Sequence, residues 1–387
     1  MTRVALASKE ATRARTTFLH GRTSTMSAHA PAGERAGAPA DDQNGTAAPS
    51  TGARRDGPVL ALDLGGTHLR TAVVDRDGRL LARRRIRTPL LDGAEAVLDA
   101  CVATLRQTLE EHAAAGGESP IALGISAPGP LDVRRGILFD PPNLGLTFRD
   151  FALGPRLTQA LGMPTHLERD THVAALAEGR FGAGQGMTDY VYMTVSTGIG
   201  GAVVTGGRLM TGPDGLAGEL GHITVDMHGP VCGCGAKGHL ERLTSGSGIA
   251  RSAVEALADG RRSPALEATL AAIAPAPLEA SHVAAAEDQG DPLAIELLER
   301  ARQAFAAAMV SFVDIFAPQC VIVGGGVATG QGERLLGPAR EAVAAHAFRT
   351  QAARVKIVPA ALGDDVGLIG ALPLVDAASP HNGGTSR

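Results

Sequence analysis

The sequence contains no tryptophan, and aromatic residues make up only 3% of it. The core of a folded domain must therefore be built from aliphatic side chains, which a hydrophobic share of 44% can supply. Runs of about 18 uncharged apolar residues, the length needed to cross a bilayer, do not occur, so we expect no membrane span. Basic residues (36) do not outnumber acidic ones (40), and the formal charge of -4 argues against nucleic acid as a partner.

Cysteine is also scarce, because four residues in a chain of 387 do not make a disulfide framework. The N-terminal region has no apolar stretch of the secretory type, and we expect a cytoplasmic protein. A chain of this length has room for two globular domains or one large one. Glycine, by contrast, is abundant at 50 residues, which predicts many tight turns and close backbone approaches.

The two ends of the chain differ in composition from the part between them. Residues 1–57 are rich in alanine, glycine, serine, threonine and proline without apolar periodicity, so we expect a disordered N-terminal extension. Its arginine-rich beginning also has the composition of a transit peptide. Residues 377–387 are predicted to form a disordered tail, which leaves 58–376 as the structured body.

The structured body shows a similar order of elements twice. Apolar runs separated by turn residues predict strands at 59–63, 69–74 and 80–87, followed by a helix over 92–115, a strand at 121–125 and a helix over 171–181. A second series has strands at 190–195 and 202–205, a helix over 291–316 and a strand at 320–323. This recurrence predicts two similar α/β lobes with a cleft between them, an N-terminal lobe at 58–182 and a C-terminal lobe at 183–376.

Three glycine-rich turns follow apolar strands, a pattern typical of phosphate binding because glycine lets backbone N–H groups approach an anion. The first turn holds Gly65, Gly66 and Thr67 directly after Asp63, a carboxylate that can hold Mg²⁺ or its waters. The second turn contains Thr197, Gly198, Gly200 and Gly201, and the third is Gly324, Gly325 and Gly326. Each turn by itself also fits plain turn chemistry, and the lysine of a P-loop is absent.

A possible metal site consists of His222, Cys232, Cys234 and His239. These four residues lie in one stretch of 18 residues in the C-terminal lobe. Two thiolates and two imidazoles make a tetrahedral donor set that suits Zn²⁺. All four positions of the ion would be filled by protein, so the site is expected to be structural. A reduced cysteine pair beside unrelated histidines is the alternative, and His228 could replace one ligand.

Several motifs together give the chain a family likeness. They are Asp63–Thr67, Ser126–Asp132, Pro142–Gly145, Ser196–Gly201, Gly218–His222 and Cys232–Glu241. With them, residues 58–376 resemble the ROK family of sugar kinases and sugar-responsive repressors, within the actin/hexokinase superfamily. The resemblance implies an α/β fold of two ribonuclease H-like (actin-like ATPase) lobes with an interlobe cleft. It also implies ATP, Mg²⁺ and structural Zn²⁺ as cofactors, and a homodimer.

The resemblance further implies roles for single residues. Asp170 takes the place of the family's catalytic base, although an aspartate there could also cap the helix that follows. Sugar-binding residues of the family correspond to Asn143, Glu219, His222 and Glu241. The turns at 63–67 and 197–201 correspond to its two phosphate loops, and Gly324–Gly326 to the adenosine side of ATP.

Two positions depart from the family pattern. His239 stands where the family has a third zinc cysteine, a change that keeps a tetrahedral site. Arg169 stands where the family has an asparagine beside the catalytic aspartate. Because arginine only donates hydrogen bonds, this change concerns which sugar is bound. The side chain of Arg169 can contact the substrate, or it can turn away to solvent or an ion pair.

The function expected from these observations is that of an ATP-dependent hexose kinase, with glucose and its 6-hydroxyl as the first expectation. Kinases of N-acetylmannosamine, N-acetylglucosamine, allose or fructose share every motif and stay open. A sugar-sensing transcriptional regulator is the alternative of another class, but residues 1–57 are short and polar for a winged helix-turn-helix. Polyphosphate is an alternative donor, against which the adenosine-side glycines argue.

Overall fold

The computed structural model describes residues 56–378. The expected N-terminal extension, apart from residues 56 and 57, and residues 379–387 of the expected tail lie outside this range. The last helix, α13 (Ala371–Ala378), includes residues 377 and 378, so the ordered chain continues slightly beyond the expected boundary. In the described part of the chain, none of the helices combines the length and apolarity that crossing a bilayer requires.

A first mixed sheet has five strands in the order β3-β2-β1-β4-β7. Its strands are β1 (Val59–Leu64), β2 (His68–Val74), β3 (Leu80–Arg87), β4 (Leu123–Ala127) and β7 (Thr165–Arg169). The first three form an antiparallel meander, while β4 and β7 continue the sheet parallel to β1. The parallel strands of this half therefore end at the same edge, where functional groups can meet.

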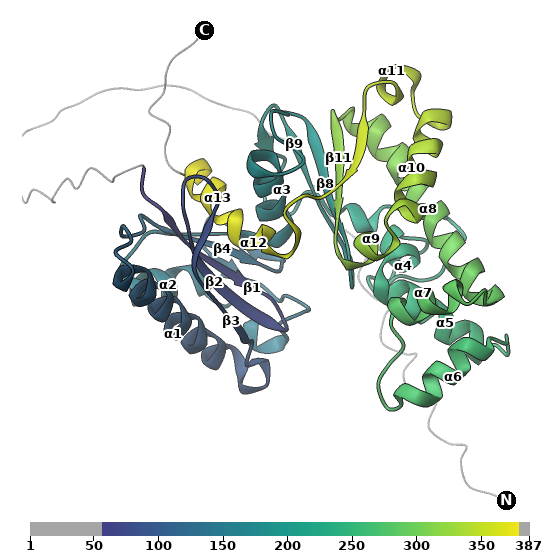
Figure 1. The fold of residues 1–387 in the computed structure, drawn as a ribbon, viewed down its shortest axis with the longest axis horizontal. Helices are drawn as coiled ribbons and strands as arrows, with labels where there is room; N and C mark the ends of the chain where they lie inside the picture. The colour runs from purple at the N-terminus through teal and green to yellow at the C-terminus, as the bar shows by residue number, and fades with distance from the viewer. Residues whose placement is uncertain (1–55, 379–387) are drawn as a thin grey trace, which may run out of the picture. The chain divides into compact units, whose positions relative to one another are not determined.

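Helices cover both faces of the first sheet (Figure 1). On one face, Leu60 and Leu62 of β1 pack with α1 (Gly93–Ala114) and α2 (Leu153–Leu161) in one apolar cluster. On the other face, Val59 and Ala61 pack with α13 and α12 (Val366–Ile369). Because side chains alternate along a strand, Asp63 belongs to the face covered by α12 and α13.

A second mixed sheet repeats this pattern with the strand order β10-β9-β8-β11-β12. Its strands are β8 (Tyr190–Val195), β9 (Ile199–Thr205), β10 (Arg208–Leu209), β11 (Cys320–Gly324) and β12 (Lys356–Pro359). Again three antiparallel strands are followed by two that run parallel to the first of them. The two series of elements expected from the sequence thus form two sheets of the same topology.

The second sheet is also covered on both faces (Figure 1). Its largest apolar cluster joins β8 and β11 to α8 (Pro292–Phe316) and α10 (Glu333–His346). On the opposite face, Tyr190 and Tyr192 pack with alanines of α3 (Asp170–Phe181). A separate cluster joins α8 to α5 (Gly246–Ala258), α6 (Pro264–Ile273) and α7 (Ala280–Asp288).

The remaining elements are short. They are the strands β5 (Leu131–Asp132) and β6 (Ile137–Leu138), the helices α4 (Leu240–Thr244), α9 (Gly326–Gln331) and α11 (Arg349–Ala352), and the 3₁₀ helices η1 (Leu90–Asp92), η2 (Leu146–Phe148), η3 (Leu220–His222) and η4 (Gly363–Asp365). Of these, α4, α9 and η3 carry or adjoin residues of the candidate site.

Two of the predicted strands differ from those observed by two residues or more, and the others by at most one. The strand predicted at 121–125 is β4 at Leu123–Ala127, two positions further along the chain. The strand predicted at 202–205 begins earlier, at Ile199, so that Gly200 and Gly201 are strand residues paired with Thr194 and Met193. The second glycine turn is therefore restricted to the link between β8 and β9, at residues 196–198.

Candidate active site

The ends of strands from both sheets line one cavity of about 900 Å³. Its wall includes Gly65 and Gly66 after β1, Gly324–Gly326 after β11, and the carboxylates of Asp63 and Asp170. Asn143 also faces this cavity. The structure thus brings together the first and third glycine turns, both aspartates and one of the expected sugar-binding residues, although these positions are widely separated in the sequence.

The first glycine turn is held tightly between its neighbours. The N–H of Gly65 donates to the carbonyl of His68 at 3.0 Å, and the hydroxyl of Thr88 donates to the carbonyl of Gly65 at 2.7 Å. A Cβ atom on Gly66 would lie only 2.5 Å from the carbonyl oxygen of Asn143. Glycine is therefore required here for a close backbone approach. Thr67 is exposed and lies outside the residues that line the cavity.

Asp63 is a buried carboxylate with two protein partners. The hydroxyl of Ser126, its neighbour on β4, donates to Oδ1 at 3.0 Å, and Arg70 on β2 lies 2.5 Å from Oδ2. Burial raises the pKa of Asp63, while the charge of Arg70 and the hydrogen bond from Ser126 act in the opposite direction. The sequence analysis did not anticipate Arg70, which the antiparallel register places directly opposite Asp63.

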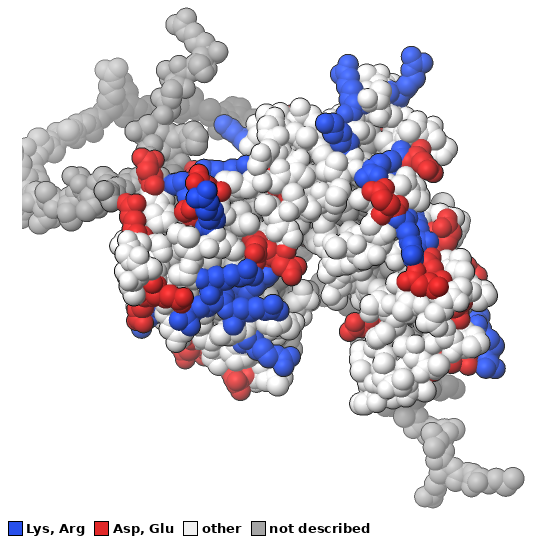
Figure 2. All heavy atoms as spheres, in the orientation of Figure 1, with Lys and Arg blue, Asp and Glu red and all other residues white. Residues whose placement is uncertain are grey.

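Arg70 belongs to a basic cluster on the first sheet. Figure 2 shows these side chains gathered where β2 and β3 lie in Figure 1, and the two strands carry Arg70, Arg83, Arg84, Arg85 and Arg87. Acidic partners neutralise part of the cluster, since Arg83 pairs with Asp365 and Arg84 with Glu111. The cluster is therefore largely a network of ion pairs, one of which reaches the cavity through Asp63.

Asp170 stands at the junction between β7 and α3. Its carboxylate accepts a hydrogen bond from the N–H of Thr171 at 2.7 Å. The side chain is exposed to the cavity, but protein surrounds it on its other sides. This burial raises the pKa of Asp170 to about 6, and the negative charge of Asp63 adds to the effect. A carboxylate with such a pKa can take up a proton near neutral pH.

Arg169, directly before Asp170, turns into the protein. Its side chain is 7% exposed and pairs with Glu219 through a contact of 2.5 Å between Nη2 and Oε1. Its Nη1 donates to the carbonyl of Ala217 at 3.0 Å. Of the orientations considered from the sequence, the structure therefore shows an ion pair. Its partner is one of the expected sugar-binding residues.

The second glycine turn makes different contacts from those expected. The carboxylate of Glu241, in the first turn of α4, accepts from the N–H of Ile199 at 2.9 Å and lies against Gly198. A Cβ on Gly200 would lie 2.5 Å from the methyl group of Thr171, and one on Gly201 would lie 2.5 Å from Leu220. Gly200 and Gly201 thus set the close packing of β9 against α3 and η3, while Gly198 lies against Glu241 of α4, and none of the three lines the large cavity.

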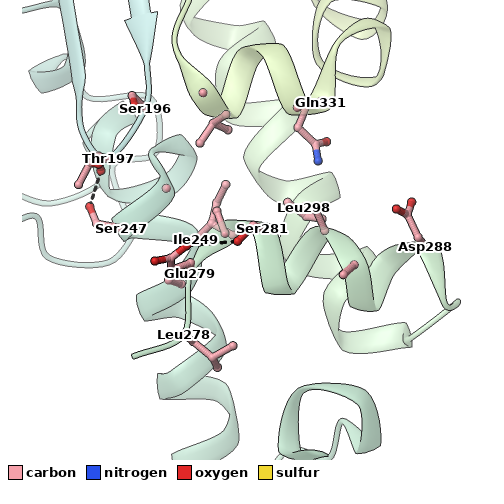
Figure 3. A pocket seen from close by; sticks show the side chains of 18 residues that line it. Ser196, Thr197, Ser247, Ile249, Leu278, Glu279, Ser281, Asp288, Leu298 and Gln331 are labelled. Carbon is pink, nitrogen blue, oxygen red and sulfur yellow. Dashed lines mark hydrogen bonds between the residues drawn. The ribbon is translucent and has the colours of Figure 1, made fainter. Parts of the chain in front are cut away.

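Thr197 faces a second pocket of about 660 Å³ (Figure 3). The pocket has apolar walls from Ile249, Leu278 and Leu298, and polar groups from Glu279 and Gln331. Ser196, Gly326 and Gly330 line both this pocket and the large cavity, so a ligand can extend from one to the other. The sequence analysis missed this pocket, because α5, α7 and α8 carry no motif that marks it.

The four expected metal ligands form one cluster. The ligand atoms of His222, Cys232, Cys234 and His239 all lie within 4.8 Å of one another. Nδ1 of His239 is 3.2 Å from both Nδ1 of His222 and Sγ of Cys234. Two atoms bound to one tetrahedral zinc ion are roughly 3.3–3.8 Å apart, so the donor set and its spacing fit Zn²⁺. His228 is not part of the cluster formed by the described residues.

The fold and the site define an α/β protein in which two glycine turns and two aspartates line one cavity. A profile of the ROK family matches residues 59–378, and the chain belongs to that family. A glucokinase from Thermotoga maritima is 35% identical over 82% of this chain and 96% of its own length. An N-acetylmannosamine kinase from Shigella flexneri is 36% identical over 81% of this chain and 96% of its own.

A solved structure is similar over the same region. It is a ROK family glucokinase from Streptomyces griseus in complex with glucose and AMPPNP, with 33% identity and a TM-score of 0.65. The match covers 82% of this chain and 99% of the other. These relatives confirm the ROK assignment and the relationship to sugar kinases expected from the motifs.

Proposed function

We propose that the protein is an ATP-dependent sugar kinase that transfers the γ-phosphate of MgATP to a hexose hydroxyl, with the 6-hydroxyl of glucose as the preferred acceptor. The observation that carries this proposal is the position of Asp170. Its carboxylate faces a cavity shared with two glycine turns, and its pKa of about 6 suits a general base. Asp170 takes the proton of the acceptor hydroxyl as the sugar oxygen attacks the γ-phosphorus, the bond from that phosphorus to the bridging oxygen breaks, and ADP leaves.

The donor occupies the cavity and the second pocket in this proposal. Backbone N–H groups at Gly66 and Gly324–Gly326 bind the phosphates, Gly65 shapes the first turn, and the apolar wall near Ile249 receives the adenine ring. Asp63 is the carboxylate placed to hold Mg²⁺ or its waters, since it lines the cavity beside Gly65. The ion, when bound, offsets the charge of the phosphates.

The acceptor side is formed by Asn143, Glu219, Glu241 and His222. Glu219 is half-exposed despite its pairing with Arg169, so one carboxylate edge can accept from a sugar hydroxyl. Glu241 is anchored by the N–H of Ile199 and flanks the metal cluster in sequence. The four cluster residues bind a structural Zn²⁺ that holds His222 and the stretch before Glu241 in place.

The two sheets correspond to two ribonuclease H-like lobes, at 58–182 and 183–376, that close over the substrates and exclude water. Residues 366–376 come from the end of the second segment but pack on the first sheet. Because of this return, the structural unit built on the first sheet includes them. A homodimer and a cytoplasmic location stay predictions.

The test is an ADP-release assay of the full chain with MgATP and a panel of sugars. Glucose should give the highest kcat/KM, with a sugar phosphate as product. A clear preference for N-acetylmannosamine, N-acetylglucosamine, allose or fructose would keep the kinase and replace the sugar. Turnover with polyphosphate but not ATP would replace the donor. No turnover on any sugar, together with sequence-specific DNA binding, would favour a regulator and reject the proposal.

A further inference from the structure

We propose that Arg169 is a positioning residue: it does not bind the sugar itself but fixes the carboxylate of Glu219 and the backbone at Ala217 so that Glu219 presents its free oxygen to a substrate hydroxyl. This inference rests on the proposed kinase function and concerns its acceptor side. Its basis is the ion pair between the buried Arg169 and the half-exposed Glu219.

The hydrogen bonds of Arg169 go to the protein rather than to open space. One terminal nitrogen donates to Glu219 and the other to the carbonyl of Ala217. The side chain passes close to Gly129, where a Cβ atom would lie 3.3 Å from Nε. A buried guanidinium needs partners on its donors, and these contacts supply them.

A second side chain holds the same backbone position. His172, one turn further along α3, contacts the carbonyl of Ala217 through Nε2 at 3.3 Å and Glu168 through Nδ1 at 3.0 Å. Gly218 follows with a φ of +93°, a conformation that glycine adopts without strain. This turn lets the carbonyl of Ala217 and the side chain of Glu219 both face Arg169. The start of α3, which carries Asp170, is thus tied to the segment that carries Glu219.

In this proposal, the carboxylate of Glu219 recognises the sugar by accepting hydrogen bonds from it. The asparagine found at position 169 in the family can donate and accept, whereas Arg169 donates only, and each of its terminal nitrogens already donates one hydrogen bond to the protein. In this proposal the group offered to the substrate is the exposed edge of Glu219, which accepts only. The substrate class is therefore a sugar with a free hydroxyl at the contacted ring position. A deoxy or fluoro analogue at that position leaves the carboxylate without a donor and is rejected.

The experiment is a double-mutant cycle on the full chain with Arg169→Met and Glu219→Gln, measured as KM for the sugar and for ATP and as kcat. Arg169→Met should raise the sugar KM roughly 10- to 100-fold and change the ATP KM less than about twofold. The double variant should be little worse than either single variant, because both act through one contact. Arg261→Met, which removes an exposed pairing with Glu296, is the matched control and should leave all three constants unchanged.

Arg169→Lys covers the case in which the methionine variant does not fold. An ammonium group keeps the charge but cannot bridge two acceptors as a planar guanidinium does, so the sugar KM should still rise. Additive effects in the cycle, or an unchanged sugar KM in the folded variants, would overturn the inference while leaving the kinase intact. An inactive wild-type protein would instead reject the proposed function, and calorimetric titration with the sugar would then test the cycle without catalysis.

Discussion

The carboxylate of Glu178 accepts a hydrogen bond from the backbone N–H of Ala361 at 2.9 Å, and the N–H of Leu362 donates to the same oxygen at the same distance. The other oxygen accepts from the N–H of Ala183 at 2.8 Å. Glu178 lies on α3 and is fully buried, whereas Ala361 lies in the link from β12 to the helices that cover the first sheet. One side chain therefore fixes a connection between the two sheets.

Replacing this carboxylate should destabilise the protein. In Glu178→Gln, an amide nitrogen must face backbone donors, so at least one buried N–H loses its acceptor, at a cost of about 1–3 kcal/mol. The melting temperature should fall by several degrees relative to wild type. Glu341→Gln, an exposed change on α10, is the control and should leave it unchanged. Equal melting curves for the two variants would show that the Glu178 contacts contribute nothing.

Removing the proposed base should lower turnover rather than binding. Asp170→Asn keeps the size of the side chain and the hydrogen bond from Thr171 but cannot take up a proton. We expect kcat to fall roughly 10²- to 10⁴-fold, with the sugar KM within a few-fold of wild type. The ADP-release assay measures both constants. Turnover near that of wild type would contradict the role given to Asp170.

The pH dependence follows from the same residue. Burial raises the pKa of Asp170 from 3.8 to about 6, and only the ionised carboxylate can act as a base. The kcat/KM for the sugar should therefore fall about tenfold per unit below pH 6 and level off above it. The residual activity of Asp170→Asn should lack this limb. A wild-type limb near pH 4 would mean that the pKa of Asp170 is not raised, and a limb that persists in Asp170→Asn would mean that Asp170 is not the base.

The raised pKa of Asp170 also makes the stability of the folded protein depend on pH. The sign of this dependence is opposite to that for a salt-bridged acid. The folded state binds the proton of Asp170 more tightly than the unfolded chain, so this group favours folding below pH 4 and loses that contribution as the pH rises through about 6. Asp170→Asn, which cannot ionise, should thus gain stability relative to wild type as the pH rises across this range. Melting curves at several pH values measure the difference.

Metal content tests the Cys/His cluster. The protein purified without chelators should carry about one zinc ion per chain, and Cys234→Ser should lose most of it because a thiolate ligand is gone. Cys320→Ala, which changes a buried thiol of β11 outside the cluster, should keep the metal. Elemental analysis gives the stoichiometry. Wild-type protein without bound metal would reject a zinc site at these residues.

Sequence patterns predicted the local features of this protein well. The strand from Val59 and the glycine turn after it, the helix over 292–316 and the metal cluster all depend on residues close together in the chain. Apolar periodicity and ligand spacing describe such features directly. The sequence analysis also selected the glycines after β11 and the aspartate at position 170 as candidates, and the fold shows that they face one cavity.

The features that escaped prediction depend on distant pairs. Arg70 meets Asp63 through strand register, and Arg169 meets Glu219 across 50 positions of the chain. The second pocket is shaped by helices whose apolar faces look like any other core. Glycines 200 and 201 were assigned to a phosphate loop, and the structure places them in β9, where a Cβ atom on either would crowd Thr171 or Leu220.

The packing of α12 and α13 on the first sheet has a consequence for biosynthesis. Val59, Ala61, Ala72 and Val74 share one apolar cluster with Leu368, Leu372 and Val375. In a nascent chain that does not yet include those helices, this face of the sheet is exposed to water, even when its strands have already been synthesised. Cotranslational folding of the N-terminal half therefore cannot reach completion until residues 366–378 emerge, and until then that half is a natural client for chaperones.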